Sequence, residues 1–233
     1  MDKAESPPAG WRLALWLLVA AYAAVEAPWL AHLAARIFYR FPLNYNEGWN
    51  VMFASNVLAG RPLYVPLDRF PLTPNNYPPL SYPIIGGLGW LSGDLLLTGR
   101  IVALFSSVIV GGLIFRIVDN VTGQKPAAFL AALLWLWLML GLAPERLVMY
   151  DPQMLGHAFS LAALGLFSEW EDRLTARRVW LLAVLCCVAL FIKHLLVVVP
   201  LVIALALFLS DQRSFRVFAS AGCVAAAAMG FAS

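Results

Sequence analysis

Long apolar runs alternate with short polar segments along almost the whole chain. The runs cover residues 11–38, 97–118, 126–143, 152–167, 179–209 and 215–233. Lipid offers a backbone no hydrogen-bond partners, so segments that cross a membrane form helices or closed barrels. Continuous apolarity, rather than strict alternation, favours helices. The pattern therefore predicts an all-α bundle of membrane-spanning helices.

The run 179–209 is interrupted by the adjacent polar residues Lys193 and His194. It is too long for one comfortable helix and short for two, so we expect two short or tilted helices that meet near the membrane surface. With both included, the runs predict about seven spans, since each needs about 20 residues. The last span is incomplete, because the chain stops at Ser233 inside an apolar run.

The longest interruption of this pattern extends over residues 39–82 and is rich in Asn, Pro, Tyr and Arg. Its first part, NEGWNVMFASNVLAG, has the pattern of a short amphipathic helix that ends at Gly60. Its second part, RPLYVPLDRFPLTPNNYPPLSYP, has too many prolines for regular structure. The apolar segment 80–91 that follows is too short to cross a membrane as a helix. We therefore expect one long loop that carries short helices at the membrane surface.

The composition agrees with a membrane protein. Hydrophobic residues make up 62% of the chain and charged residues 12%, with a mean hydropathy of +0.79, whereas a soluble domain carries about a quarter charged residues. The net charge of +3 is spread over the loops without a basic stripe, so nucleic acid is not an expected partner. The three cysteines lie inside apolar runs, where they act as small hydrophobic residues: Cys186, Cys187 and Cys223.

Loop charges predict the orientation through the excess of cations on the cytoplasmic side. If the N-terminus is cytoplasmic and 80–91 does not cross, nine cations lie inside: Lys3, Arg12, Arg116, Lys125, Arg173, Arg177, Arg178, Arg213 and Arg216. If 80–91 crosses, the inside set falls to five: Lys3, Arg12, Arg100, Arg146 and Lys193. The first orientation is preferred. It places the loop 39–82, the loop around Asp151 and the Lys193–His194 pair on one non-cytoplasmic face.

Two carboxylates on this face are the candidate catalytic residues, Glu47 and Asp151. A carboxylate there can act as a general base or bind a divalent cation. Each also has a simpler structural explanation. Asn46 would cap a helix whose first turn holds Glu47, and an aspartate before a proline often starts a helix, as Asp151 would before Pro152.

Several polar residues on the same face suit a phosphate or a sugar. Lys193, His194 and Arg100 are candidates for binding the phosphate of a lipid. Arg146, beside Glu145, is more simply explained as an anchor to lipid headgroups. His157 suits a hydrogen bond to a neighbouring helix, and Glu26, inside the first apolar run, has no assignable partner. Candidates for substrate contact in the long loop are Asn46, Asn50, Asn76 and Tyr77.

The order of these features resembles the GT-C superfamily of membrane glycosyltransferases. The matching motifs are NEG in a long loop after the first run, NNYPPLSYP, GDLLLTGR, a basic loop, YDPQ and FIKHLLVVVPL. The likeness covers residues 11–209 and is closest to the branch of protein mannosyltransferases, aminoarabinose transferases and rhizobial lipopolysaccharide galacturonosyltransferases. Many relatives carry Asp-Glu where this chain has Asn46-Glu47.

The resemblance implies transfer of a sugar, with inversion, from a polyprenyl-phosphate-linked donor to a lipid, glycan or protein acceptor. It implies that Glu47 and Asp151 are the catalytic or metal-binding acids. It also implies that Lys193, with Arg100 and His194, holds the donor phosphate. Residues 1–233 would be one module at the inner, cytoplasmic membrane of the cell, and the family architecture would continue beyond it.

Two other functions fit the sequence. A transporter or flippase for an amphipathic lipid would line its path with Lys193, His194 and Glu26. A non-catalytic membrane scaffold is the other alternative, because Asn46 replaces an acid of the family and the chain stops inside an apolar run. Motifs of soluble enzymes give no support to a different chemistry, since the sequence has no Gly-rich phosphate loop, HExxH or GxSxG.

Overall fold

The computed structural model describes residues 9–66, 68 and 74–231, and these residues form helices without a β-strand. Two short 3-10 helices are η1 (Pro144–Leu147) and η2 (Glu171–Arg173). The α-helices are α1 (Ala9–Arg36), α2 (Tyr45–Leu58), α3 (Ser81–Ser92), α4 (Leu95–Thr122), α5 (Lys125–Leu142), α6 (Gln153–Trp170), α7 (Ala176–Ile192), α8 (Val198–Ser210) and α9 (Gln212–Phe231). The predicted all-α class is therefore confirmed.

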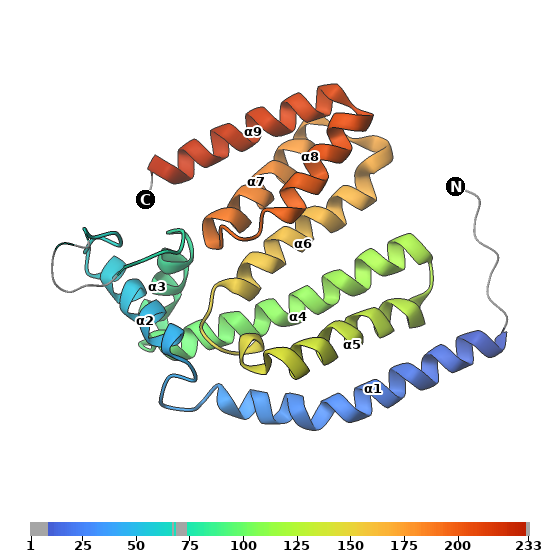
Figure 1. The fold of residues 1–233 in the computed structure, drawn as a ribbon, viewed down its shortest axis with the longest axis horizontal. Helices are drawn as coiled ribbons and strands as arrows, with labels where there is room; N and C mark the ends of the chain where they lie inside the picture. Colours follow the sequence, from blue (N-terminus) through green and yellow to red (C-terminus); the bar gives the residue numbers. More distant parts are fainter. Residues whose placement is uncertain (1–8, 67, 69–73, 232–233) are drawn as a thin grey trace.

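The long helices run back and forth between two ends of the molecule, as Figure 1 shows. At one end lie α2 and α3, the start of α4, η1, the start of α6 and the junction of α7 with α8. We call this the α2–α3 end. The turns between α4 and α5 and between α6 and α7 lie at the other end. The three polar segments expected on one face are thus found at one end of the bundle.

The predicted number of about seven spans is wrong. Three helices of the described chain, α1, α4 and α5, are long and apolar enough to cross a membrane. Helices α7 and α8 have 17 and 13 residues, fewer than the roughly 20 that a span needs. Helices α6 and α9 contain polar and charged residues that lower their hydropathy. The three spans indicate a multi-pass membrane protein.

Two predicted local features are confirmed. Helix α7 ends at Ile192 and α8 begins at Val198, so the polar pair Lys193–His194 does divide the long apolar run. Helix α2 has the predicted place, and Gly60, with a φ of 64°, follows its end in the left-handed conformation that glycine favours.

The predicted N-cap of α2, Asn46, is wrong by two residues. The N-cap is Asn44, whose side chain accepts a hydrogen bond from the backbone N–H of Asn46. Asn44 has the extended backbone that an N-cap residue needs, with φ of −149° and ψ of 156°, whereas Asn46 already lies inside the helix. The side chain of Asn46 is therefore not used to start α2.

Glu26 lies inside α1 and is almost fully buried. Both of its carboxylate oxygens lack a hydrogen-bond partner among the residues that the structure describes. Helix α1 packs mainly on α5, where the rings of Tyr22 and Trp137 are 5.9 Å apart. No partner for Glu26 could be assigned from the sequence, and the described part of the chain supplies none.

Gly99 allows α4 to approach the loop that leads into α6. A Cβ atom at this position would lie 2.2 Å from Cγ of Tyr150 and 2.7 Å from its Cβ. Tyr150 is buried, so its ring has no space into which to move. The close approach places the residue after it, Asp151, against the rest of the α2–α3 end.

The first prediction concerns this contact. Gly99→Ala should destabilise the protein by about 1–3 kcal/mol, because overpacking moves a buried ring. Gly112→Ala, in the same helix, is the matched control, since a Cβ there would meet nothing within 4 Å. Thermal unfolding of both variants in detergent measures the effect. Equal melting temperatures for the two variants would show that Tyr150 does not pack on α4 as described.

Candidate functional site

A buried ion pair between Glu47 and Arg100 lies at the centre of the α2–α3 end. Both side chains have 0% exposure. The guanidinium donates from Nη2 to Oε2 of Glu47 at 2.7 Å and from Nε to Oε1 at 2.9 Å. This two-bond geometry is the strongest form of an arginine–carboxylate contact. The pair joins α2 to α4.

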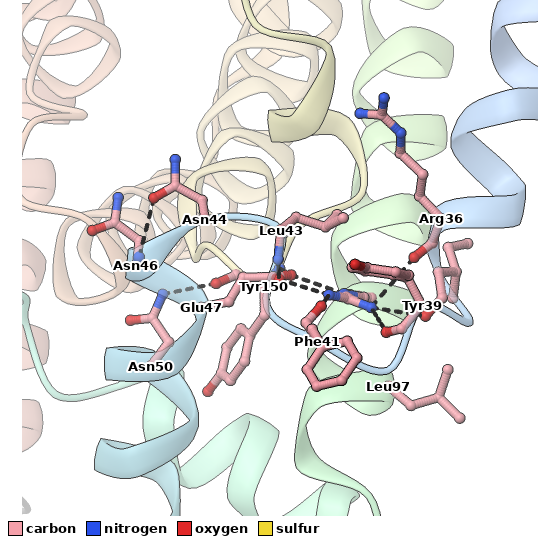
Figure 2. A network of polar contacts seen from close by, with 12 residues as sticks. Arg36, Tyr39, Phe41, Leu43, Asn44, Asn46, Glu47, Asn50, Leu97 and Tyr150 are labelled. Atoms are coloured by element: carbon pink, nitrogen blue, oxygen red, sulfur yellow. Dashed lines mark hydrogen bonds and ion pairs between the residues drawn. The ribbon is translucent and has the colours of Figure 1, made fainter.

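The same two side chains hold the backbone around them; Figure 2 labels Glu47 and its backbone partners Leu43 and Tyr150. The carboxylate of Glu47 accepts from the N–H of Tyr150 at 2.7 Å and from that of Leu43 at 2.5 Å. The guanidinium also donates to backbone carbonyl oxygens at the end of α1 and in the segment after it: Arg36, Ile37, Tyr39 and Phe41. Every bond of the pair is therefore made within the protein, and its burial leaves no room for a substrate.

A second cluster is centred on Asp151, the residue after Tyr150. Its Oδ2 lies 2.8 Å from Nη1 of Arg146, and its Oδ1 lies 3.2 Å from Nζ of Lys193. Oδ1 also accepts from the backbone N–H of Gln153 at 2.9 Å, which satisfies a free donor at the start of α6. The cluster thus joins η1, α6 and the α7–α8 junction.

The two clusters are connected through the backbone of Tyr150. Its N–H donates to Glu47, and its carbonyl accepts from Nδ2 of Asn50 at 2.8 Å. Both contacts link α2 to a residue about a hundred positions further along the chain. Because Asp151 follows directly, the Glu47–Arg100 pair fixes the position of the second cluster.

Neither carboxylate suits a divalent cation in this arrangement. Glu47 faces the guanidinium of Arg100, and Asp151 lies between Arg146 and Lys193, so each carboxylate already has a cation against it. Within the ranges described, the structure contains no group of three or more His, Cys, Asp or Glu residues that could hold a metal ion. The expected metal role of Glu47 and Asp151 therefore does not fit these neighbours.

Two cavities of about 510 Å³ each adjoin the second cluster. The charged cavity is lined by Asn76, Tyr77, Met139, Arg146, Gln153, Met154, His157, Lys193, His194 and Leu195. The amide cavity is lined by Tyr45, Asn46, Trp49, Asn50, Phe53, Pro74, Asn75, Asn76, Tyr77, Tyr82 and Arg146. The residues common to both are Asn76, Tyr77 and Arg146. These three residues form a shared wall.

Lys193 and His157 shape the charged cavity. The Lys193 ammonium lies over the Tyr77 ring, 3.8 Å from its centre, in a cation–π contact. Nε2 of His157 is 2.9 Å from the amide nitrogen Nε2 of Gln153, and an amide nitrogen can only donate, so this imidazole nitrogen accepts. Burial, and then the nearby charge of Lys193, lower the pKa of His157 below its usual value of 6.5. The neutral imidazole therefore faces the cavity.

The structure sorts the predicted site residues into three places. Glu47 and Arg100 lie behind the cavities in the buried pair. The charged cavity brings together Lys193, His194, Asn76 and Tyr77, with Asp151 bonded to its wall. The amide cavity contains Asn46 and Asn50 and shares Asn76 and Tyr77.

Sequence reasoning missed the role of Arg146, which we expected to anchor lipid headgroups. It contacts Asp151 and lines both cavities. Its spacing, five residues before Asp151 on a short 3-10 helix, is the one signal that could have found it. Trp49 and Tyr45 were also missed as lining residues, because aromatic residues gather at membrane surfaces for other reasons.

The second prediction tests the buried ion pair. Glu47→Gln should destabilise the protein by about 3–5 kcal/mol, because Arg100 would be left buried without its counter-charge. The control is Glu169→Gln, which breaks the exposed Arg116–Glu169 pair and should cost about 1 kcal/mol or less. Unfolding by denaturant in mixed micelles gives both values. A smaller loss in Glu47→Gln than in Glu169→Gln would contradict the structural role of Glu47.

The third prediction concerns pH. The folded-state pKa of His157 is lowered, so the unfolded chain takes up a proton first and stability falls as pH drops through about 6.5. In NMR titration of histidine-labelled protein, His157 should titrate below that value. Lys193→Met should raise this pKa, because it removes a positive charge, whereas Lys125→Met at the other end of the bundle should leave it unchanged. An unchanged His157 pKa in Lys193→Met would refute their proximity.

Comparisons of the chain with protein-family models, with curated proteins and with solved structures find no match. The likeness to the GT-C superfamily therefore stays a prediction from the order of the sequence motifs. A function can still be inferred from the two polar clusters, the two cavities that share a wall, and the placement of both at one end of an apolar helical bundle.

Proposed function

We propose that this protein is a membrane glycosyltransferase that takes its sugar from a polyprenyl-phosphate-linked donor. The observation that carries the proposal is the position of Asp151, a buried carboxylate bonded to Arg146 in the wall between the charged cavity and the amide cavity. Sugar transfer from a lipid phosphate needs a site for an anion, a site for an acceptor and a base between them.

The charged cavity suits the donor phosphate. Lys193 and Arg146 supply positive charge, and His194 adds a hydrogen-bonding ring. Arginine binds phosphate through two parallel hydrogen bonds, and a lysine over an aromatic ring retains donors for a further contact. The cavity lies at one end of helices apolar enough to cross a membrane, so a lipid-borne phosphate can reach it while its tail stays in the bilayer.

The chemistry is a direct displacement at the anomeric carbon of the donor. The acceptor hydroxyl oxygen forms the new bond to this carbon as the bond to the phosphate oxygen breaks. The electron pair of the broken bond leaves with the polyprenyl phosphate, and Asp151 takes the acceptor proton. Before the donor binds, both oxygens of Asp151 contact cations. A phosphate that draws Arg146 and Lys193 toward itself frees the carboxylate to act as the base.

Glu47 and Arg100 act as positioning residues in this proposal. Their side chains bond to each other and to backbone groups, not to a side chain that lines a cavity, whereas Asp151 is bonded to the cavity-lining residues Arg146 and Lys193. Glu47 accepts from the N–H of Tyr150, the residue before Asp151, and so fixes the backbone there. This holds the Asp151 carboxylate in contact with Arg146 and Lys193. The Asn46-Glu47 pair is then compatible with catalysis, because the base is supplied by Asp151.

The proposed orientation has the N-terminus in the cytoplasm and the α2–α3 end on the outer face of the cell membrane. Cations cluster at the opposite end, around the α4–α5, α6–α7 and α8–α9 turns: Arg116, Lys125, Arg173, Arg177, Arg178, Arg213 and Arg216. Cytoplasmic loops are enriched in such residues, which supports this orientation.

The fourth prediction tests the function. Purified protein in lipid nanodiscs is incubated with a panel of polyprenyl-phosphate sugars and candidate lipid, glycan and peptide acceptors. Transfer should be detected with at least one pair. Asp151→Asn should lower kcat by at least about 100-fold, as expected for loss of a general base. Lys193→Gln should act mainly on the KM of the donor.

Glu145→Gln is the control, because Glu145 lies in η1 beside Arg146 but has no part in either ion-pair cluster. Its activity should match that of the unchanged protein. Absence of transfer from every donor, or full activity in Asp151→Asn, would rule out the mechanism proposed above.

A further inference from the structure

We infer that the amide cavity is a saccharide-binding site and that the bound saccharide is the acceptor of the transfer; the acceptor role rests on the function proposed above. The cavity lies against α2 at the α2–α3 end, on the far side of the wall that it shares with the charged cavity.

The lining combines aromatic rings with side-chain amides. Trp49 and Tyr77 are among its aromatic residues, and Asn46 and Asn76 are among its amides. The C–H face of a sugar ring is apolar and packs on the negative face of an aromatic ring. An amide carries donors and an acceptor side by side, which suits the hydroxyl groups of a sugar. A lining of this kind favours a polyhydroxylated ring over an acyl chain.

Asn75 supplies independent evidence that a polar ligand belongs here. Its Oδ1 accepts from the N–H of Tyr77 and from the hydroxyl of Tyr82, both at 3.0 Å. These two bonds fix the orientation of the amide. Its Nδ2 is buried and has no hydrogen-bond partner among the residues that the structure describes. An unpaired buried donor is unfavourable, and a hydroxyl or ring oxygen of a ligand would satisfy it.

Two further side-chain amides of the lining have no hydrogen-bond partner among the described residues. The side chains of Asn46 and Asn76 line the cavity and make no hydrogen bond to any other described part of the chain. They come from α2 and from the segment before α3, so they reach the cavity from different elements. Free donors and acceptors from separate elements suit a ligand with hydroxyl groups on more than one side.

Charge separates this ligand from the donor. Among the described residues that line the amide cavity, Arg146 is the one charged residue, and it is bonded to Asp151. A phosphorylated or strongly acidic acceptor would be attracted instead to Lys193 in the neighbouring cavity. The volume of about 510 Å³ is more than a single sugar ring needs and lies within the usual range for small-molecule sites. The cavity therefore fits a neutral saccharide of more than one ring.

The shared wall places such a saccharide for reaction. A hydroxyl group beside Arg146 and Tyr77 would face the charged cavity, where the donor phosphate is proposed to bind. Asp151 is in contact with Arg146, and 2.8 Å separate Oδ2 of Asp151 from Nη1 of Arg146. The proton of the acceptor hydroxyl thus has a carboxylate close by.

Binding is tested without any donor, with the protein in phosphatidylcholine nanodiscs. The probes are mannobiose, maltose, cellobiose and lactose, and a serine-containing tetrapeptide is the non-sugar comparison. Saturation-transfer NMR and tryptophan fluorescence report binding. At least one disaccharide should bind saturably, and Trp49→Leu and Asn76→Ala should each weaken it about tenfold, as expected for loss of one stacking or hydrogen-bonding contact.

Trp90→Leu is the matched control for the aromatic variant. Trp90 is 73% exposed near the end of α3 and does not line the cavity, so affinity should not change. Absence of binding by all four disaccharides overturns the inference, as does binding that neither Trp49→Leu nor Asn76→Ala weakens.

The two proposals fail in different ways. If a donor transfers its sugar only to the peptide and no disaccharide binds, the saccharide site is wrong and the transferase function stands. If a disaccharide binds at Trp49 and no donor supports transfer, the saccharide site stands, and both the acceptor role and the transferase function are wrong.

Discussion

The arrangement of the α2–α3 end depends on one interaction, the buried ion pair of Glu47 and Arg100. A buried charge is tolerated only when its partner and its remaining hydrogen bonds are present. Here the pair is satisfied by backbone groups from the end of α1, the loop before α2 and the segment before α6. Removing either charge would leave the other exposed to an apolar interior, so these segments have one compatible arrangement.

That arrangement forms two cavities that share a wall and differ in charge, because Lys193 lines only one of them. Arg146 and Tyr77 face both, while Lys193 contributes to one side and Trp49 to the other. Asp151 is bonded to Arg146 and Lys193 and so belongs to the boundary. An anion and a neutral polyhydroxylated molecule can therefore be held close together without competing for the same groups. This division is the physical basis for both proposals.

The rest of the bundle supports the α2–α3 end. Helices α1, α4 and α5 supply the apolar spans, and Gly99 lets the Tyr150 ring pack directly on α4. The neighbouring helices α6, α7 and α9 pack through small and aliphatic residues such as Ala163, Leu182 and Ala221. The packed helices thereby fix the loops at the α2–α3 end.

The sequence by itself determined the helical class, the membrane character and the convergence of three polar segments, because apolar runs, loop charges and the Lys193–His194 break are local signals. Only the tertiary structure decided how the polar residues pair. It buried Glu47 with Arg100, 53 positions apart, and joined Asp151 to Lys193 and Arg146. Pairing depends on which helix ends meet in space, and the residues adjacent in the sequence do not determine that. The number of spans was overestimated because α7 and α8 are shorter than a span needs and because α6 and α9 contain polar and charged residues.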